Sequence, residues 1–171
     1  MSTRHRVCDV LDSHAISYAL IGAAALAARG VARSTFDIDL LTVDRRALDS
    51  ATWQSLGNEA DIRRGDADDP LAGVVRVTQG ADPPVDVVVG RHAWQARVVE
   101  RAEPLGDRIR VALARDLVLL KLYAGGSQDL WDIAELLRHS PAELRAEVED
   151  DLASLPASMR ERWRAVALRA D

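Results

Sequence analysis

The spacing of hydrophobic positions changes twice between residues 18 and 44. A short apolar run at residues 18–21 leads to Gly22, and an alanine-rich segment typical of a helix then continues to Gly30. A second apolar, β-branched run follows and carries Asp37 and Asp39. The pattern predicts a strand, a tight turn, a helix and a second strand.

The rest of the chain predicts a mixed α/β core followed by helices alone. Helical spacing or capping signals predict further helices at residues 4–14, 44–56 and 91–100. Alternating or continuous apolar runs predict further strands at residues 61–64, 71–78, 85–89, 102–105 and 109–111. From residue 112 the pattern is helical throughout, so we expect a core at residues 1–112 and a helical C-terminal extension at residues 113–171 that packs on it.

Composition narrows the class of protein. A chain of 171 residues with 48% apolar content is long enough for one domain with a proper core. A net charge of −5 gives no global basic field, so a nucleic-acid partner would need a local basic patch. The single Cys8 excludes an internal disulfide, and the histidine spacing predicts no zinc site. The longest uncharged run, residues 13–28, is too short and too mixed to span a bilayer, and we expect a cytoplasmic protein.

Three carboxylates are candidates for a metal site. Side chains alternate along a strand, so Asp37 and Asp39 share one face. Like charges this close repel each other unless a cation lies between them, and Mg²⁺ prefers carboxylate oxygens together with phosphates. Asp86 is the only charge in a run of valines, so it lies on a hydrated face or serves a site. The alternative is a solvated strand face with no ligand.

Gly22 is a candidate for phosphate binding. Glycine allows the backbone to approach a ligand closely, and the following helix directs free N–H groups at an anion. An ordinary strand-to-helix turn would also use glycine, so Gly22 alone does not show that the turn binds phosphate. Together with the carboxylates, the turn predicts a nucleotide site.

These residues resemble a known family. The first motif of the polymerase-β-like nucleotidyltransferase superfamily is similar to the segment that holds Gly22, Ala23, Arg33, Thr35, Asp37 and Asp39. A second block at residues 116–133, with Lys121, Asp129 and Asp132, resembles the AbiEii-type branch, the nucleotidyltransferase toxins of type IV toxin–antitoxin systems. The matches extend over residues 18–137. Ala23 departs from the serine that many members carry, and Gln128 stands where AbiEii relatives usually have a basic residue.

The resemblance implies a fold, a reaction and a set of roles. The implied fold is a mixed-sheet nucleotidyltransferase core with a C-terminal helical extension, and the reaction moves a nucleoside monophosphate from an NTP to an acceptor hydroxyl and releases pyrophosphate. The implied metal ligands are Asp37, Asp39 and Asp86, which would hold two Mg²⁺ ions. The implied nucleotide-binding residues are Gly22, Ala23, Arg33, Thr35 and Lys121, and Lys121 and Asp129 join the three carboxylates as catalytic residues. Without the resemblance, Lys121 could extend to solvent, and Asp129 could be an ordinary first-turn acid of a helix.

Three functions remain open at this point. Resemblance to the AbiEii branch favours a tRNA end as acceptor, a toxin role and a cognate antitoxin partner. A small hydroxyl-bearing acceptor is the second interpretation, because aminoglycoside and lincosamide nucleotidyltransferases share the core motif and the net acidity argues against a large RNA footprint. The third is a non-catalytic member that binds a nucleotide or a partner protein, which the departures at Ala23 and Gln128 favour.

Overall fold

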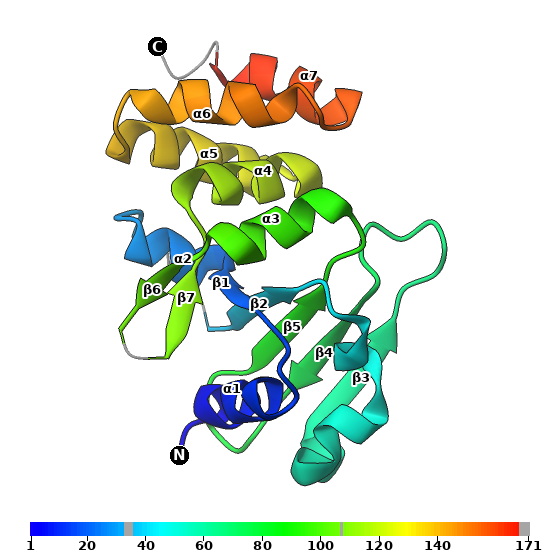
Figure 1. Cartoon of the computed structure of the whole chain (residues 1–171). Helices are drawn as coiled ribbons and strands as arrows, with labels where there is room; N and C mark the ends of the chain where they lie inside the picture. Colours follow the sequence, from blue (N-terminus) through cyan, green and yellow to red (C-terminus); the bar gives the residue numbers. More distant parts are fainter. Residues whose placement is uncertain (33–35, 107, 168–171) are drawn as a thin grey trace.

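A seven-stranded mixed sheet forms the centre of the molecule (Figure 1). The computed structural model describes residues 1–32, 36–106 and 108–167. The strands lie in the order β3-β4-β5-β2-β1-β7-β6. Their bounds are β1 Ala19–Ile21, β2 Ile38–Thr42, β3 Ala60–Arg64, β4 Gly73–Val77, β5 Val85–Val89, β6 Glu103–Leu105 and β7 Ile109–Val111. Strand β2 runs parallel to β5 and β1 runs parallel to β7, whereas the other neighbours are antiparallel.

Helices cover the sheet, and those after the last strand stack at one end of the molecule. The α-helices are α1 Thr3–Ser13, α2 Gly22–Ala28, α3 Ala93–Arg101, α4 Ala114–Ala124, α5 Ser127–His139, α6 Glu143–Leu152 and α7 Ala157–Ala167. In Figure 1, α4 to α7 form layers above α3, and α1 lies at the opposite end near the N-terminus. The predicted mixed α/β fold with a C-terminal helical extension is confirmed. The division at residues 112 and 113 stays a prediction, although β7 ends at Val111 and α4 begins at Ala114. Among the described residues, no helix has the length and apolarity needed to cross a bilayer.

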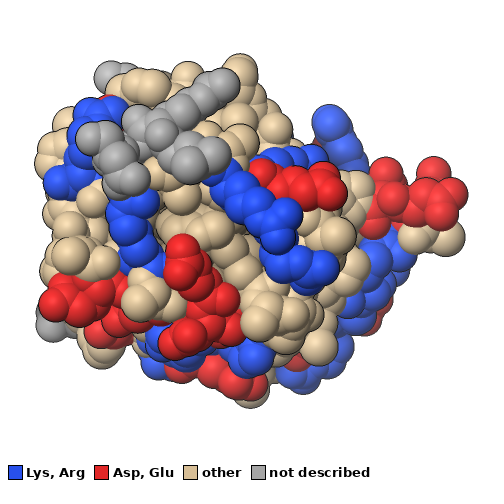
Figure 2. All heavy atoms as spheres, turned by 90° about the horizontal axis from the view of Figure 1, so that it is seen from above, with Lys and Arg blue, Asp and Glu red and all other residues tan. Residues whose placement is uncertain are grey.

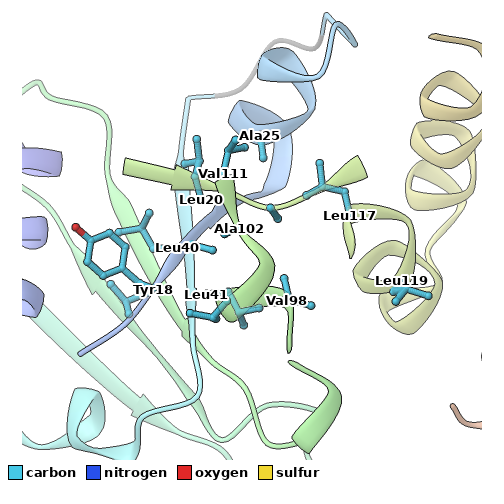
Figure 3. Packing of buried hydrophobic residues seen from close by; sticks show 14 of the residues in the cluster. Tyr18, Leu20, Ala25, Leu40, Leu41, Val98, Ala102, Val111, Leu117 and Leu119 are labelled. Carbon is cyan, nitrogen blue, oxygen red and sulfur yellow. The ribbon is translucent and has the colours of Figure 1, made fainter. Parts of the chain in front are cut away.

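Alternation along the strands separates a closed face from a face that carries the candidate site. Val85, Val87 and Val89 of β5 are fully buried, whereas Asp86 and Val88 between them are partly exposed. In β2, Leu40 and Leu41 point to opposite faces, and Figure 3 shows Leu40 on the side of Tyr18 and Leu41 near Val98 of α3. Each buried valine or leucine contributes roughly 1.5–3 kcal/mol, so in β5 this burial fixes one closed face, whereas in β2 both Leu40 and Leu41 are buried because α3 covers the Leu41 side.

Residues 45–59 differ from the prediction. The single helix expected at residues 44–56 is wrong, because the structure has 3₁₀ turns at η1 Arg45–Leu48 and η2 Ser50–Glu59, and η2 is itself interrupted by a kink at Gly57. Asp44 does cap η1, with its carboxylate accepting from the backbone N–H of Arg46 at 2.9 Å. Side chains explain the change: the Thr52 hydroxyl donates to the Arg46 carbonyl at 2.7 Å and the Trp53 indole donates to the Ala47 carbonyl at 2.8 Å. These carbonyls are the acceptors that a continuous α-helix would have used.

Ion pairs and capping bonds attach the C-terminal helices to the core. Arg101 of α3 donates to the buried Asp116 of α4 and, at 3.0 Å, to Asp151 of α6. Arg162 of α7 donates to the Tyr123 carbonyl at 3.0 Å and so satisfies a free carbonyl at the end of α4. The helical extension is therefore held in one place relative to the sheet.

Candidate active site

Four strands contribute a row of charged side chains to one face of the sheet. Asp39 of β2 is in register with Asp86 of β5, Asp86 with Arg76 of β4, and Arg76 with Asp61 of β3. Residues in register on neighbouring strands project to the same face. We call Asp39, Asp86, Arg76 and Asp61 the charged row. Asp37 comes immediately before β2 and alternates with Asp39 onto the same face.

Arg76 joins two of the predicted carboxylates. Its Nη1 lies 2.8 Å from Oδ2 of Asp86, and its Nη2 lies 3.3 Å from Oδ2 of Asp37. Burial raises the pKa of Asp86 above its usual value, Arg76 lowers it and Asp37 raises it further. Sequence reasoning missed Arg76, although it is the only charge in its valine-rich strand, the same signal that pointed to Asp86. The guanidinium offsets part of the repulsion that the carboxylates would otherwise feel.

Gly22 lies directly against Asp39. It begins α2 with φ +65°, a conformation that favours glycine. A Cβ at this position would lie 2.0 Å from Oδ2 and 3.0 Å from Cβ of Asp39. Both the backbone angle and the contact therefore require glycine. The side chain of Ala23 is buried and apolar, so a ligand could form hydrogen bonds only with backbone groups of this turn.

Lys121 contacts two carboxylates of the chain itself. Its Nζ lies 2.8 Å from Oδ1 of Asp129 and 2.8 Å from Oδ2 of Asp132, and the Asp132 side chain is fully buried. The backbone N–H of Gly126 donates to Asp129 at 3.0 Å, and the Gln128 amide donates to Asp132 at 3.3 Å. We call Lys121, Asp129 and Asp132 the lysine triad. It fixes the start of α5 against α4.

One cavity brings the two motif blocks together. A hollow of about 300 Å³ is lined by Gly22 and Asp39 from the sheet side and by Lys121 and Asp129 from the helical extension. Most of the remaining wall is apolar and comes from β1, β2, β5 and α4. We call this hollow the glycine cavity. Four of the residues that the sequence singled out therefore meet in one place.

A second cavity opens beside Asp86. It has a volume of about 420 Å³ and is lined by Asp86, Arg76, Arg63 and Arg64 together with part of the loop at residues 65–71. We call it the arginine cavity. Pro70 and Leu71 of this loop line both cavities, which places the two hollows side by side.

The loop at residues 65–71, which lies between the two cavities, is held by the side chains of Arg91, just after β5, and Tyr123 of α4. Arg91 donates to the Ala67 carbonyl at 3.0 Å and to the Leu71 carbonyl at 2.9 Å. The Tyr123 hydroxyl of α4 donates to the Pro70 carbonyl at 3.1 Å and lies 2.7 Å from the His92 ring. These contacts fix the wall that the two cavities share.

The predicted metal ligands Asp37, Asp39 and Asp86 lie on the same face of the sheet, but their side chains are not grouped closely enough to form a metal site as they stand. Within residues 1–32, 36–106 and 108–167, no three His, Cys, Asp or Glu side chains are close enough to hold a metal ion. Oδ1 of Asp86 is buried and has no hydrogen-bond partner among these residues. A buried carboxylate oxygen without a donor, next to two further carboxylates, fits a hard divalent cation in donor type. Arg33 and Thr35, the other predicted phosphate contacts, lie outside the described residues.

The fold is that of nucleotidyltransferase-like proteins. The solution structure of the antibiotic-resistance factor ANT(2'')-Ia matches with a TM-score of 0.56 and 17% identity, over 88% of this chain and 91% of that one. A crystal structure of ANT(2'')-Ia with adenylyl-2''-tobramycin matches with a TM-score of 0.55 and 17% identity, over 86% and 95%. An antigenic nucleotidyltransferase-like protein from Paracoccidioides brasiliensis matches with a TM-score of 0.51 and 16% identity, over 94% of each chain.

Comparisons by sequence do not assign the chain to a family. No family model matches the chain, and no curated protein matches it by sequence. The resemblance to nucleotidyltransferases therefore holds at the level of the fold. The closer similarity to the AbiEii-type branch stays a prediction.

Proposed function

We propose that this chain is a nucleotidyltransferase that moves a nucleoside monophosphate from an NTP to an acceptor hydroxyl and releases pyrophosphate. The observation that carries the proposal is the position of Asp39, which lies against the glycine turn and in register with Asp86. Asp39 lines a cavity that also contains Lys121 and Asp129, and Asp86 lies next to Asp39 on the neighbouring strand. The nucleotidyltransferase-like fold supports the same conclusion.

The glycine cavity is the proposed nucleotide site. Its apolar wall can bury the base and ribose, while the backbone of the turn at Gly22 would contact the phosphates. An ammonium group has three N–H donors, and Asp129 and Asp132 account for two contacts of Lys121. The third donor is available for a triphosphate oxygen without breaking the lysine triad.

Asp37, Asp39 and Asp86 are the residues that would hold Mg²⁺. When bound, the ion would supply positive charge to the phosphates and lower the pKa of the acceptor hydroxyl. Asp39 is positioned by contact with Gly22, and Asp86 by its parallel pairing with β2. Arg76 keeps Asp37 and Asp86 on the same face and balances part of their charge.

Pyrophosphate release tests the proposal. We would incubate the protein with Mg²⁺ and each of the four NTPs and compare wild type with Asp39→Asn, which keeps the shape of the side chain and removes its charge. The expected loss is roughly 100-fold or more, because one group that stabilises developing charge typically contributes that much. Asp150→Asn, at an exposed carboxylate of α6, should leave the rate unchanged. Equal rates for Asp39→Asn and wild type would contradict the assignment.

Two acceptor classes remain as proposals. A tRNA end, with a toxin role and an antitoxin partner, comes from the AbiEii resemblance. On the face drawn in Figure 2, acidic and basic side chains interleave, so this face offers RNA no continuous basic surface. A small acceptor is supported by the fold shared with ANT(2'')-Ia, whose structure contains adenylyl-2''-tobramycin. Transfer of label from an α-labelled NTP to bulk tRNA or to an aminoglycoside panel separates the two.

A non-catalytic role as a nucleotide- or partner-binding protein is the third proposal. It predicts that the wild-type protein binds NTP but releases no pyrophosphate. The same assay therefore distinguishes it from both enzyme proposals.

A further inference from the structure

Gln95 is a buried amide in the wall of the glycine cavity. It lies near the start of α3, is 1% exposed, and lines the cavity together with Leu41 and Val88 of the sheet. Its Oε1 accepts from the backbone N–H of Arg91 at 2.8 Å and from that of His92 at 2.9 Å. These two bonds fix the orientation of the amide, because turning it over would place its NH2 group against two N–H donors.

The NH2 group of Gln95 has no hydrogen-bond partner in the described part of the chain. Every side-chain hydrogen bond of Gln95 there uses Oε1, so both donors of Nε2 are unused. Tyr123, the other neutral polar side chain of the described cavity wall, is already engaged: its hydroxyl donates to the Pro70 carbonyl at 3.1 Å and lies 2.7 Å from the His92 ring. Because buried polar groups are normally hydrogen-bonded, the unused donors of Gln95 indicate a ligand that brings an acceptor.

Gln95 and the glycine turn lie at different levels along the strands. Asp39 and Asp86 are in register near the start of β2 and β5, and Gly22 lies against Asp39. Gln95 is bonded to the segment that follows β5, and the last residue of β5, Val89, lies roughly 10 Å beyond Asp86 at about 3.3 Å per residue. A nucleotide with its phosphates at the turn would therefore extend along β2 and β5 and place its base at Gln95. The edge of the base farthest from the ribose, which carries the group at position 4 of a pyrimidine or position 6 of a purine, would face the amide.

We infer that the nucleotide carries a keto group at this position, as in uracil or guanine, and that the NH2 group of Gln95 donates to its oxygen. The inference rests on the proposed function and adds the class of NTP. An amino group at the same position, as in cytosine or adenine, would set donors against donors and leave the buried amide unpaired. A site built to hydrogen-bond one group rejects an analogue without that group more strongly than an apolar pocket rejects a change in size. Gln95 would therefore determine which base is bound and take no part in the transfer itself.

Matched nucleotide pairs test the inference. UTP against CTP, and ITP against ATP, compare a keto group with an amino group on bases of the same size. We would measure kcat/KM for Mg²⁺-dependent pyrophosphate release and, separately from catalysis, the Kd of the non-hydrolysable α,β-methylene analogues by calorimetry. In the pair that binds more tightly, the keto member should be favoured roughly tenfold or more by both measures. Equal or stronger binding of the amino member overturns the inference and leaves the proposed function intact.

The two measures also separate this inference from the proposed function. Binding with a keto preference but no pyrophosphate release from any nucleotide would overturn the proposed enzyme and support the role of Gln95 in binding. Absence of both binding and release for all of these nucleotides would overturn the proposed function and this inference with it.

Gln95→Glu separates base recognition from the structural role of the side chain. Glutamate keeps an oxygen that accepts from the Arg91 and His92 N–H groups and replaces the NH2 donors by a second acceptor. The added negative charge weakens binding of every nucleotide, so the readout is the keto-to-amino ratio within a pair, which should fall roughly tenfold or more. Gln54→Glu, at an exposed glutamine of η2, is the matched control and should keep the wild-type ratio. A wild-type ratio in Gln95→Glu, with folding confirmed by circular dichroism, contradicts the inference; if this variant does not fold, the wild-type ratios still decide.

Discussion

Replacing Gly22 by alanine adds one methyl group where the glycine turn meets Asp39. The new Cβ would lie 2.0 Å from Oδ2, 2.8 Å from Cγ and 3.0 Å from Cβ of Asp39. Carbon atoms in contact are normally about 3.5–4.0 Å apart. Rotation of the carboxylate relieves the first contact but not the third, since Cβ does not move when the side chain rotates. Either β2 or the turn must therefore shift.

The size of the effect follows from two separate costs. A non-glycine residue at φ +65° carries strain of about 1–2 kcal/mol, which lowers the melting temperature of a chain of this length by roughly 2–4 °C per kcal/mol. Displacement of a catalytic group by about 1 Å typically costs about 100-fold in rate. Gly80→Ala is the matched control, because Gly80 has φ +54° and no heavy atom lies within 4 Å of its added Cβ. It carries the strain without the crowding.

The assay pairs thermal unfolding, followed by circular dichroism, with Mg²⁺-dependent pyrophosphate release. Both alanine variants should unfold at a lower temperature, but only Gly22→Ala should lose roughly 100-fold or more of the rate. A wild-type rate in Gly22→Ala would show that the reaction does not need Asp39 in its place against the turn. An equal loss in Gly80→Ala would show that the rate follows stability rather than site geometry.

Three further predictions concern buried groups. Lys121→Met leaves the buried Asp132 without its ammonium partner, so the free energy of unfolding in urea should fall by about 3–5 kcal/mol, and adding Asp132→Asn should restore most of it. Arg101→Met should cost a similar amount, about 3–5 kcal/mol in the same urea titration, because it removes the cation that contacts the buried Asp116; a loss below about 1 kcal/mol would exclude this role. Burial raises the pKa of the Cys8 thiol above 9.0, so the folded state keeps a proton that the unfolded state releases, and the free energy of unfolding should decrease as pH rises above 9.0. Cys8→Ala should show a smaller decrease between about pH 8 and about pH 10, and an identical decrease would rule out the thiol as its source.

Local patterns were sufficient to predict most of the fold. The order of strands and helices follows from apolar periodicity and from glycine at turns, which act over a few residues. The prediction failed at residues 44–56 because the side chains of Thr52 and Trp53 donate hydrogen bonds to backbone carbonyls. The spacing of apolar residues carries no information about such bonds. In α5, Trp131 is 48% exposed because this helix buries Ile133 and Leu136 against its neighbours instead.

The candidate site was predictable where it lies within one strand or one turn. The shared face of Asp37 and Asp39 follows from alternation alone. Arg76 was not found, because its contacts with Asp37 and Asp86 depend on the register of three strands, and register is a property of the assembled sheet. The meeting of Lys121 with Gly22 depends on how the helical extension packs on the sheet, and only the family resemblance suggested it.

The charges around the glycine cavity constrain how a nucleotide can enter. Among the described residues that line it, Asp39 and Asp129 contribute carboxylates and Lys121 contributes an ammonium group. Lys121 is already shared between Asp129 and Asp132, so it cannot neutralise a triphosphate on its own. Like charges at this range repel strongly in a partly buried site. A triphosphate would therefore bind here only together with added positive charge, which makes nucleotide affinity and divalent-ion affinity parts of one equilibrium in this cleft.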